Sequence, residues 1–258
     1  MIKLKLIDKV SNKLTKAFLK GKVIDPIPRK FNKNINLSIK FRKLCESKVK
    51  KPIIGFKAGG TAIPVLKKLK EKEPFYAAVF KNNLLKNGKS VKINKYTLGI
   101  ELEVCFILKK EILNLKNVTT KNIQKYISHF GPCIEVVGYR QKKHGIKYLG
   151  DICSDFGANI KFILGKMAKY KKINLNNLKT KISNDKINQS ISGNTNTVYI
   201  NPINSLKFVI SKLKKDRVSP KKNFFVFTGS TVGVIPILKK GIYKGNIEKL
   251  GSVKTKII

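Results

Sequence analysis

Residues 97–108 read TLGIELEVCFIL and form the clearest strand pattern in this 258-residue chain. Aliphatic residues dominate the stretch, and no proline interrupts it. Because successive side chains of a strand point to opposite faces, Glu101 and Glu103 share one face and the aliphatic residues between them share the other. The stretch therefore predicts a buried strand that carries two carboxylates on one face.

Helices are predicted before this strand, and further strands after it. Residues 1–50 have apolar side chains at helical spacing, with Gly21 as a helix stop. We expect one helix over 119–129, another over 205–215, and short strands broken by glycine at the end of the chain. This order predicts an α+β protein with a single domain, in which the N-terminal helical part precedes a sheet-rich body over 51–258.

The net charge of +42 arises from 56 basic residues against 14 acidic ones. A basic surface attracts polyanions, but only four of the basic residues are arginine, which is the usual choice for bidentate recognition of phosphates and bases. The lysines are spread from end to end without a basic tail. We interpret the charge as compositional bias, and expect weak, salt-sensitive binding to nucleic acid but no specific recognition.

No apolar run approaches the ~20 residues that a membrane-spanning helix needs. The basic N-terminal segment lacks the unbroken apolar core of a secretory signal. Cys45, Cys105, Cys133 and Cys153 form no CxxC pair, which favours buried, reduced side chains. We therefore expect a cytoplasmic protein that does not enter a membrane.

Five of the scarce carboxylates are close in sequence, namely Glu101, Glu103, Glu135, Asp151 and Asp155. The three glutamates interrupt apolar strands, where an ionised carboxylate is unfavourable unless it is paired or bound to a cation. Neighbouring carboxylates also raise each other's pKa. A hard divalent ion such as Mg²⁺ or Mn²⁺ would satisfy all three at once. A partly exposed face on which lysines pair with the glutamates is the alternative.

Seven segments, taken in order, resemble the successive motifs of one enzyme family. They read GFKAGGT (55–61), YAAVF (76–80), LGIELEVCFIL (98–108), IEVVGYR (134–140), GDICSDFGANIKFILG (150–165), NPINSLKFV (201–209) and TGSTVGVIP (228–236). The chain thus resembles the 2-keto-4-pentenoate hydratase/4-oxalocrotonate decarboxylase family of the fumarylacetoacetate hydrolase superfamily, over nearly its whole length. The resemblance implies that superfamily's fold, with N-terminal helices before a mixed, barrel-like sheet.

The resemblance also implies roles for single residues. Glu101, Glu103 and Glu135 match the family's metal ligands, and Lys57 in GFKAG matches its active-site lysine. The ion would be Mg²⁺ or Mn²⁺, acting as a Lewis acid that stabilises an enolate of the substrate.

Asp151 and Asp155 match the two aspartates of a D-x-x-x-D-N motif. We expect Asp155 to be catalytic, by orienting Lys57 or an attacking water, or else to support the site structurally. Thr228 and Gly229 match a Thr-Gly turn that lies beside the substrate in the family.

Several positions depart from the family pattern. Phe156 stands where Asn is usual, Ala158 where a small hydroxyl residue is common, and Asn201 where a histidine is usual. Lys143 and His144 replace an acidic-aromatic pair. These differences concern the surroundings of the substrate more than the metal or the lysine.

The resemblance implies a hydratase that adds water to a 2-hydroxy-2,4-dienoate or 2-oxo-4-enoate, such as 2-hydroxypentadienoate, and it implies a homo-oligomer. A 2-oxo acid decarboxylase is the alternative within the family. An acylpyruvate hydrolase or oxaloacetate tautomerase of the wider superfamily would need a histidine base, and neither His129 nor His144 lies in a motif. A degenerate paralogue and a polyanion-binding protein are the non-catalytic alternatives.

Overall fold

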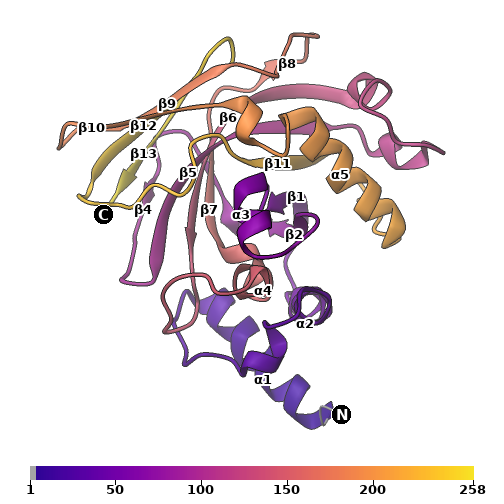
Figure 1. Cartoon of the computed structure of the whole chain (residues 1–258), viewed down its shortest axis with the longest axis vertical. Coiled ribbons are helices and arrows are strands. Elements are labelled where there is room, and N and C mark those ends of the chain that lie inside the picture. Colours follow the sequence, from indigo (N-terminus) through magenta and orange to yellow (C-terminus); the bar gives the residue numbers. More distant parts are fainter. Residues whose placement is uncertain (1–3) are drawn as a thin grey trace.

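The computed structural model describes residues 4–258, and the predicted α+β order is confirmed. Helices α1 (Leu4–Lys20) and α2 (Ile35–Ser47) come first and lie below the sheet in Figure 1. Helix α1 ends directly before Gly21, whose φ of 63° is readily adopted by glycine. The Asn34 side chain begins α2 by accepting a hydrogen bond from the Leu37 N–H.

Within residues 4–258, eight strands form a mixed sheet in the order β2-β1-β11-β5-β6-β7-β3, with β8 paired to β6. Their bounds are β1 (Ile53–Gly59), β2 (Phe75–Phe80), β3 (Leu84–Lys86), β5 (Thr97–Leu108), β6 (Ile127–Gly138), β7 (Asn159–Leu164), β8 (Ala168–Lys169) and β11 (Phe224–Ser230). Strands β1 and β11 are parallel, as are β3 and β7, and the other pairs of this sheet are antiparallel.

The other five described strands form a second sheet in the order β10-β9-β12-β13-β4. They are β4 (Ser90–Val91), β9 (Lys179–Asn184), β10 (Gln189–Asn194), β12 (Gly241–Ile247) and β13 (Gly251–Ile257). Helix α5 (Pro202–Lys215) packs against β11 and β1. There are two further short helices, α3 (Ile63–Lys68) and α4 (Leu149–Cys153), and α4 packs against α2.

Strand β5 has the two faces that its sequence predicts. Ile100, Leu102 and Val104 are fully buried in the main hydrophobic core. That core also takes side chains from α1 and from the C-terminal strands, so both parts of the chain contribute to it. The opposite face carries the glutamates and continues into a small apolar cluster that includes Cys105 and Phe227.

The helix predicted over 119–129 is wrong. This segment holds only a 3₁₀ turn, Ile123–Tyr126, and β6 begins at Ile127. Thr119 and Asn122 exchange side-chain to backbone hydrogen bonds of 2.9 and 3.1 Å, in the reciprocal pattern that caps the start of a helical turn. Pairing of the following residues with β5 then determines their conformation.

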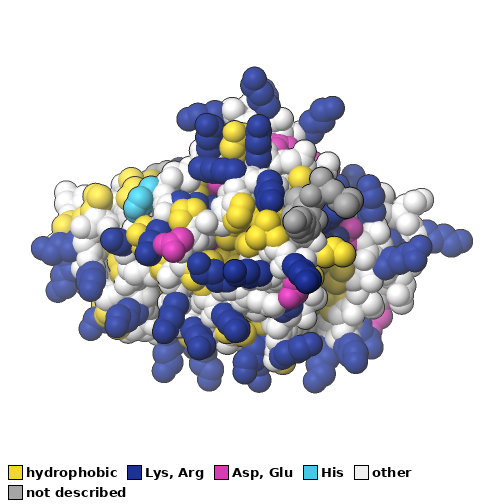
Figure 2. Space-filling model, turned by 90° about the horizontal axis from the view of Figure 1, so that it is seen from below, with side chains coloured by type: hydrophobic (Ala, Val, Ile, Leu, Met, Phe, Trp, Pro, Cys, Tyr) yellow, Lys and Arg dark blue, Asp and Glu magenta, His cyan; other side chains and the backbone are white. Residues whose placement is uncertain are grey.

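The four cysteines are buried and free, as expected. Among residues 4–258, no helix is both long and apolar enough to cross a membrane. Lysine and arginine side chains are spread across the face seen in Figure 2 and do not gather at one end of it.

Candidate metal centre and active site

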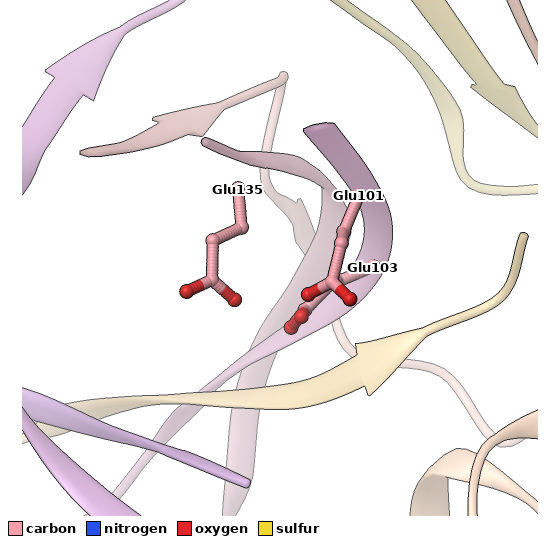
Figure 3. A group of neighbouring side chains, drawn as sticks. All are labelled: Glu101, Glu103 and Glu135. Carbon is pink, nitrogen blue, oxygen red and sulfur yellow. The ribbon is translucent and has the colours of Figure 1, made fainter. Parts of the chain in front are cut away.

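Three glutamates from two neighbouring strands meet on one face of the main sheet. The antiparallel register of β5 and β6 sets Glu101 directly opposite Glu135, and Glu103 opposite Cys133. Because residues i and i+2 share a face, all three carboxylates project to the same side. Each offers an oxygen within 4.8 Å of the others, and Figure 3 shows the carboxylates facing a common space. The predicted convergence of these residues is thus present in the structure.

The surroundings of Glu103 fit a bound cation. Its side chain is fully buried, and its Oε2 accepts a hydrogen bond of 3.0 Å from the Gly229 N–H. Its Oε1 is buried without a hydrogen-bond partner among residues 4–258. A buried carboxylate oxygen without a hydrogen-bond partner is strongly unfavourable. Three converging carboxylates are well suited to binding a hard divalent ion.

The carboxylates resist ionisation when no cation lies between them. Burial, together with the Glu135 charge, raises the pKa of Glu101 to about 7. Burial and the Glu101 charge likewise raise the pKa of Glu103 to about 7. Burial raises the pKa of Glu135 to about 8 although the Lys57 charge opposes the shift. A divalent cation would hold all three in the ionised form.

Lys57 on β1 is the basic partner of this cluster. Its buried Nζ donates to both oxygens of Glu135, at 2.6 and 2.7 Å, and to the Gly157 carbonyl at 3.2 Å. Burial would lower the pKa of Lys57, but the charges of the glutamates raise it, so the ammonium form is retained. Among the described residues no ion pair joins Glu101 or Glu103 to a base. Lysine pairing therefore accounts for one of the three glutamates.

A cavity of about 610 Å³ opens beside this cluster. Lys57 and Glu101 both line it, so the lysine and one carboxylate face the space a substrate would fill. The wall also includes the glycine turn after β1, with Thr61, and the end of β11, with Gly229. A Cβ at Gly229 would lie 2.1 Å from the Thr61 Oγ1, and Gly229 has a φ of 102°, so glycine is required there.

Asp155 lies outside the cavity wall. Its Oδ2 accepts hydrogen bonds from the Arg140 backbone N–H at 2.9 Å and from the Gln141 side chain at 2.8 Å. Its Oδ1 pairs with the Arg140 guanidinium at 3.2 Å. No hydrogen bond joins it to Lys57 within the described part of the chain. These contacts suit the supporting role that the sequence left open.

Asp151 stabilises the start of α4 and the loop before it. Its Oδ2 accepts from the backbone N–H groups of Lys147 and Tyr148 at 2.9 and 3.0 Å, which caps the start of α4. Its Oδ1 pairs with the Arg29 guanidinium at 2.8 Å. The carboxylate therefore fixes a loop near the cavity.

Residues Phe156, Gly157 and Ala158 adopt three successive positive φ angles of 52°, 69° and 58°. Such a left-handed run is strained for residues other than glycine. It turns the Gly157 carbonyl toward Lys57 and places Gly157 and Ala158 in the cavity wall. The Phe156 ring stacks on Phe18 of α1, with centroids 4.1 Å apart, so this departure from the family pattern fills the core.

Asn201 and His144, which also differ from the family pattern, make structural contacts. Asn201 caps α5, where its side chain accepts from the Asn204 N–H at 2.9 Å. The exposed His144 stacks on Tyr96 with centroids 5.2 Å apart. His129 on β6 is partly buried, and neither histidine is among the cavity-lining residues of the described chain.

Of the predicted turn residues, Thr228 is fully buried, and its hydroxyl donates to the Val104 carbonyl at 2.9 Å. It thus holds β11 to β5, whereas Gly229 lines the cavity and its N–H donates a hydrogen bond to Glu103. Thr61 and Ile146 also line the cavity, although the sequence alone did not indicate them. Thr61 lies in the GFKAGGT motif that identified Lys57, but nothing in the sequence distinguished the loop of Ile146.

Three solved structures with this fold give the comparison. The 4-oxalocrotonate decarboxylase from Pseudomonas putida G7, complexed with magnesium and adipate, matches with a TM-score of 0.86 and 17% identity, over 100% of this chain and 99% of that one. The 5-carboxymethyl-2-hydroxymuconate delta-isomerase from Mycobacterium smegmatis matches with a TM-score of 0.57 and 12% identity, over 81% of this chain and 78% of that one.

A putative fumarylacetoacetate hydrolase family protein from Yersinia pestis CO92 has a TM-score of 0.55 and 14% identity, over 81% of this chain and 95% of that one. No protein-family model matches this chain, and no curated protein matches it. At these identities the likeness establishes the fold, and the expected fumarylacetoacetate hydrolase type of fold is confirmed.

Proposed function

We propose that this protein is a divalent-metal-dependent lyase that acts on a 2-oxo acid. Its reaction is the addition of water to a 2-hydroxy-2,4-dienoate or 2-oxo-4-enoate such as 2-hydroxypenta-2,4-dienoate. The proposal is carried by one observation: Glu101, Glu103 and Glu135 converge beside Lys57 at the wall of a cavity, and one buried oxygen of Glu103 has no partner among the described residues.

Glu101, Glu103 and Glu135 would hold Mg²⁺ or Mn²⁺, which prefer oxygen donors such as carboxylates and water. When bound, the ion supplies Lewis acidity toward the oxygens of a 2-oxo acid. The Gly229 N–H keeps Glu103 oriented, because it fixes one carboxylate oxygen and leaves the other free for the cation.

Lys57 supplies the positive charge and the proton donor of the site. Its ammonium group is fixed by Glu135 and by the Gly157 carbonyl, so its position is set before a substrate arrives. In the cavity it binds the substrate carboxylate or moves a proton to and from the carbon chain. Asp155 would support Lys57 indirectly. Its hydrogen bonds to Arg140 and Gln141 fix the turn that contains the Gly157 carbonyl, which accepts from Lys57.

Decarboxylation of a 2-oxo acid is the second candidate. It is favoured by the likeness to the 4-oxalocrotonate decarboxylase structure, which covers both chains almost completely. Cleavage of an acylpyruvate by a histidine base is less well supported, because His129 and His144 both lie away from the described cavity wall.

The decisive assay measures turnover of 2-hydroxypenta-2,4-dienoate and of 4-oxalocrotonate by protein treated with chelator, before and after Mg²⁺ or Mn²⁺ is restored. We expect turnover to require the ion, and Glu103→Gln to abolish it. Glu111→Gln, at an exposed glutamate away from the cluster, is the matched control and should leave turnover unchanged.

Two outcomes would contradict the proposal. Metal binding without turnover of any 2-oxo acid would instead indicate a degenerate paralogue. Affinity for DNA that persists at physiological salt, without metal-dependent turnover, would indicate a polyanion-binding protein.

A further inference from the structure

Part of the cavity mouth is apolar, beside the exposed polar residues Ser192, Asn196 and Thr197. Ile63 and Val65 of α3, Ile146 of the loop before α4, and Val234 after β11 all line it. These side chains are 37–44% exposed, although large aliphatic residues are usually buried. Exposed apolar residues that share one concave surface indicate a surface that binds an apolar group.

The charged residues of the described lining lie together at the inner end. They are Lys57 and Glu101, which belong to the metal and lysine cluster. In a chain with 56 basic residues, the absence of any further lysine or arginine from this lining is informative. A second carboxylate at the far end of a substrate would be desolvated there without a cation to pair with.

Part of the polar lining is already engaged within the protein. The Thr231 hydroxyl donates to the Leu102 carbonyl at 2.8 Å, and the Ser230 hydroxyl donates to the Gly233 carbonyl at 2.8 Å. These donors are therefore not free for a distant anionic group. Ala158 contributes a methyl group to the same wall.

The cavity is also larger than a short acid requires. Its volume of about 610 Å³ falls within the range of roughly 300–1,000 Å³ that is typical of sites for larger organic ligands. A 2-oxo acid group anchored at Lys57 and the glutamates would leave the outer, apolar part to be filled by the rest of the molecule.

We propose that the preferred substrate is a monocarboxylic member of this class, a 2-hydroxy-2,4-dienoate or 2-oxo-4-enoate whose linear, uncharged tail is longer than that of 2-hydroxypenta-2,4-dienoate, and that dicarboxylic acids of similar length bind more weakly. This inference rests on the proposed function, because the metal end of the cavity is taken as the anchor for the 2-oxo acid group. The tail then contacts Ile63, Val65, Ile146 and Val234.

The test is isothermal titration calorimetry with Mg²⁺ present, using pyruvate, 2-oxooctanoate and 2-oxoadipate. Each methylene fully withdrawn from water strengthens binding about fourfold. Since the tail is only partly enclosed, we expect 2-oxooctanoate to bind at least tenfold more tightly than pyruvate. We expect 2-oxoadipate to bind at least tenfold more weakly than 2-oxooctanoate.

A matched pair of variants tests whether the ligand preference depends on the cavity mouth. Ile146→Lys puts a cation at the cavity mouth and should reverse the preference toward 2-oxoadipate. Ile242→Lys makes the same change on β12, at an isoleucine of equal exposure (40% against 41%) outside the lining, and should leave the preference unaltered. Both side chains are exposed, so neither substitution disturbs the core.

Three outcomes would overturn the inference in distinguishable ways. If pyruvate binds with Mg²⁺ but 2-oxoadipate binds as tightly as 2-oxooctanoate, the tail assignment is wrong and the proposed function stands. If none of the three acids binds, the proposed function fails and the inference fails with it. If Ile146→Lys alters the molecular mass in light scattering but not the ligand preference, the apolar mouth is a contact between copies of the chain.

Discussion

Removal of the Glu103 charge should change stability in opposite directions with and without a metal ion. In metal-free protein, burial raises the pKa of Glu103 from 4.5 to about 7, so the folded state favours the protonated form. The unfolded chain then binds fewer protons than the folded protein between these pH values, and stability falls as pH rises through them. Glu103→Gln removes this loss, and its amide oxygen can still accept from the Gly229 N–H.

The size of the effect follows from the shift. A rise in the pKa of Glu103 from 4.5 in the unfolded chain to about 7 in the folded protein lowers the free energy of unfolding by about 3 kcal/mol at pH 8. At pH 5 the same rise has little effect. For a chain of this length, ~3 kcal/mol moves the midpoint of thermal unfolding by roughly 6–10 °C. We therefore expect Glu103→Gln to unfold at a higher temperature than the unaltered protein at pH 8 in chelator, and at a similar temperature at pH 5.

With Mg²⁺ added the order at pH 8 should reverse. An ion at 1,000 times its dissociation constant stabilises the unaltered protein by about 4.1 kcal/mol, which exceeds the ~3 kcal/mol advantage of the variant, and the variant has no complete site for the ion. Thermal unfolding followed by circular dichroism, in chelator and in Mg²⁺ at both pH values, measures all four differences. Glu111→Gln is the control for loss of an exposed carboxylate. A Glu103→Gln protein that is less stable than the unaltered one in chelator at pH 8 would refute the reasoning.

Three further substitutions test the supporting contacts. Lys57→Met leaves Glu135 buried without its ion-pair partner, so we expect loss of turnover and about 3–5 kcal/mol of destabilisation in chelator, measured by urea unfolding. Gly229→Ala sets a Cβ 2.1 Å from the Thr61 Oγ1 at a positive φ, and should lower both thermal stability and metal affinity by calorimetry. Asp155→Asn should destabilise by about 3 kcal/mol in urea, with kcat lowered more than KM raised.

Much of the fold was open to prediction because local patterns agreed with tertiary pairing. The alternation in residues 97–108 predicted β5 and both of its faces, and the apolar spacing in 205–215 predicted α5. The helix predicted over 119–129 was wrong because the apolar spacing of this segment fits a helix, whereas pairing with β5 extends β6 back to Ile127. Such pairing depends on a partner elsewhere in the chain, which local spacing does not reveal.

The candidate site was partly predictable for the same reason. Strand periodicity placed Glu101 and Glu103 on one face, but only the register of β5 and β6 sets Glu135 opposite them. The contacts of Asp155 with Arg140 and Gln141 depend on how the loop after β6 folds back, and no spacing rule predicts that.

Metal stoichiometry tests the central claim most directly. Equilibrium dialysis of Mn²⁺ against the metal-free protein should give one ion bound per chain, and Mg²⁺ should displace it. The Glu103→Gln variant should bind none at the same concentration, while Glu111→Gln should bind one. Equal Mn²⁺ binding by the unaltered protein and by Glu103→Gln would contradict the assignment of Glu101, Glu103 and Glu135 as the metal centre.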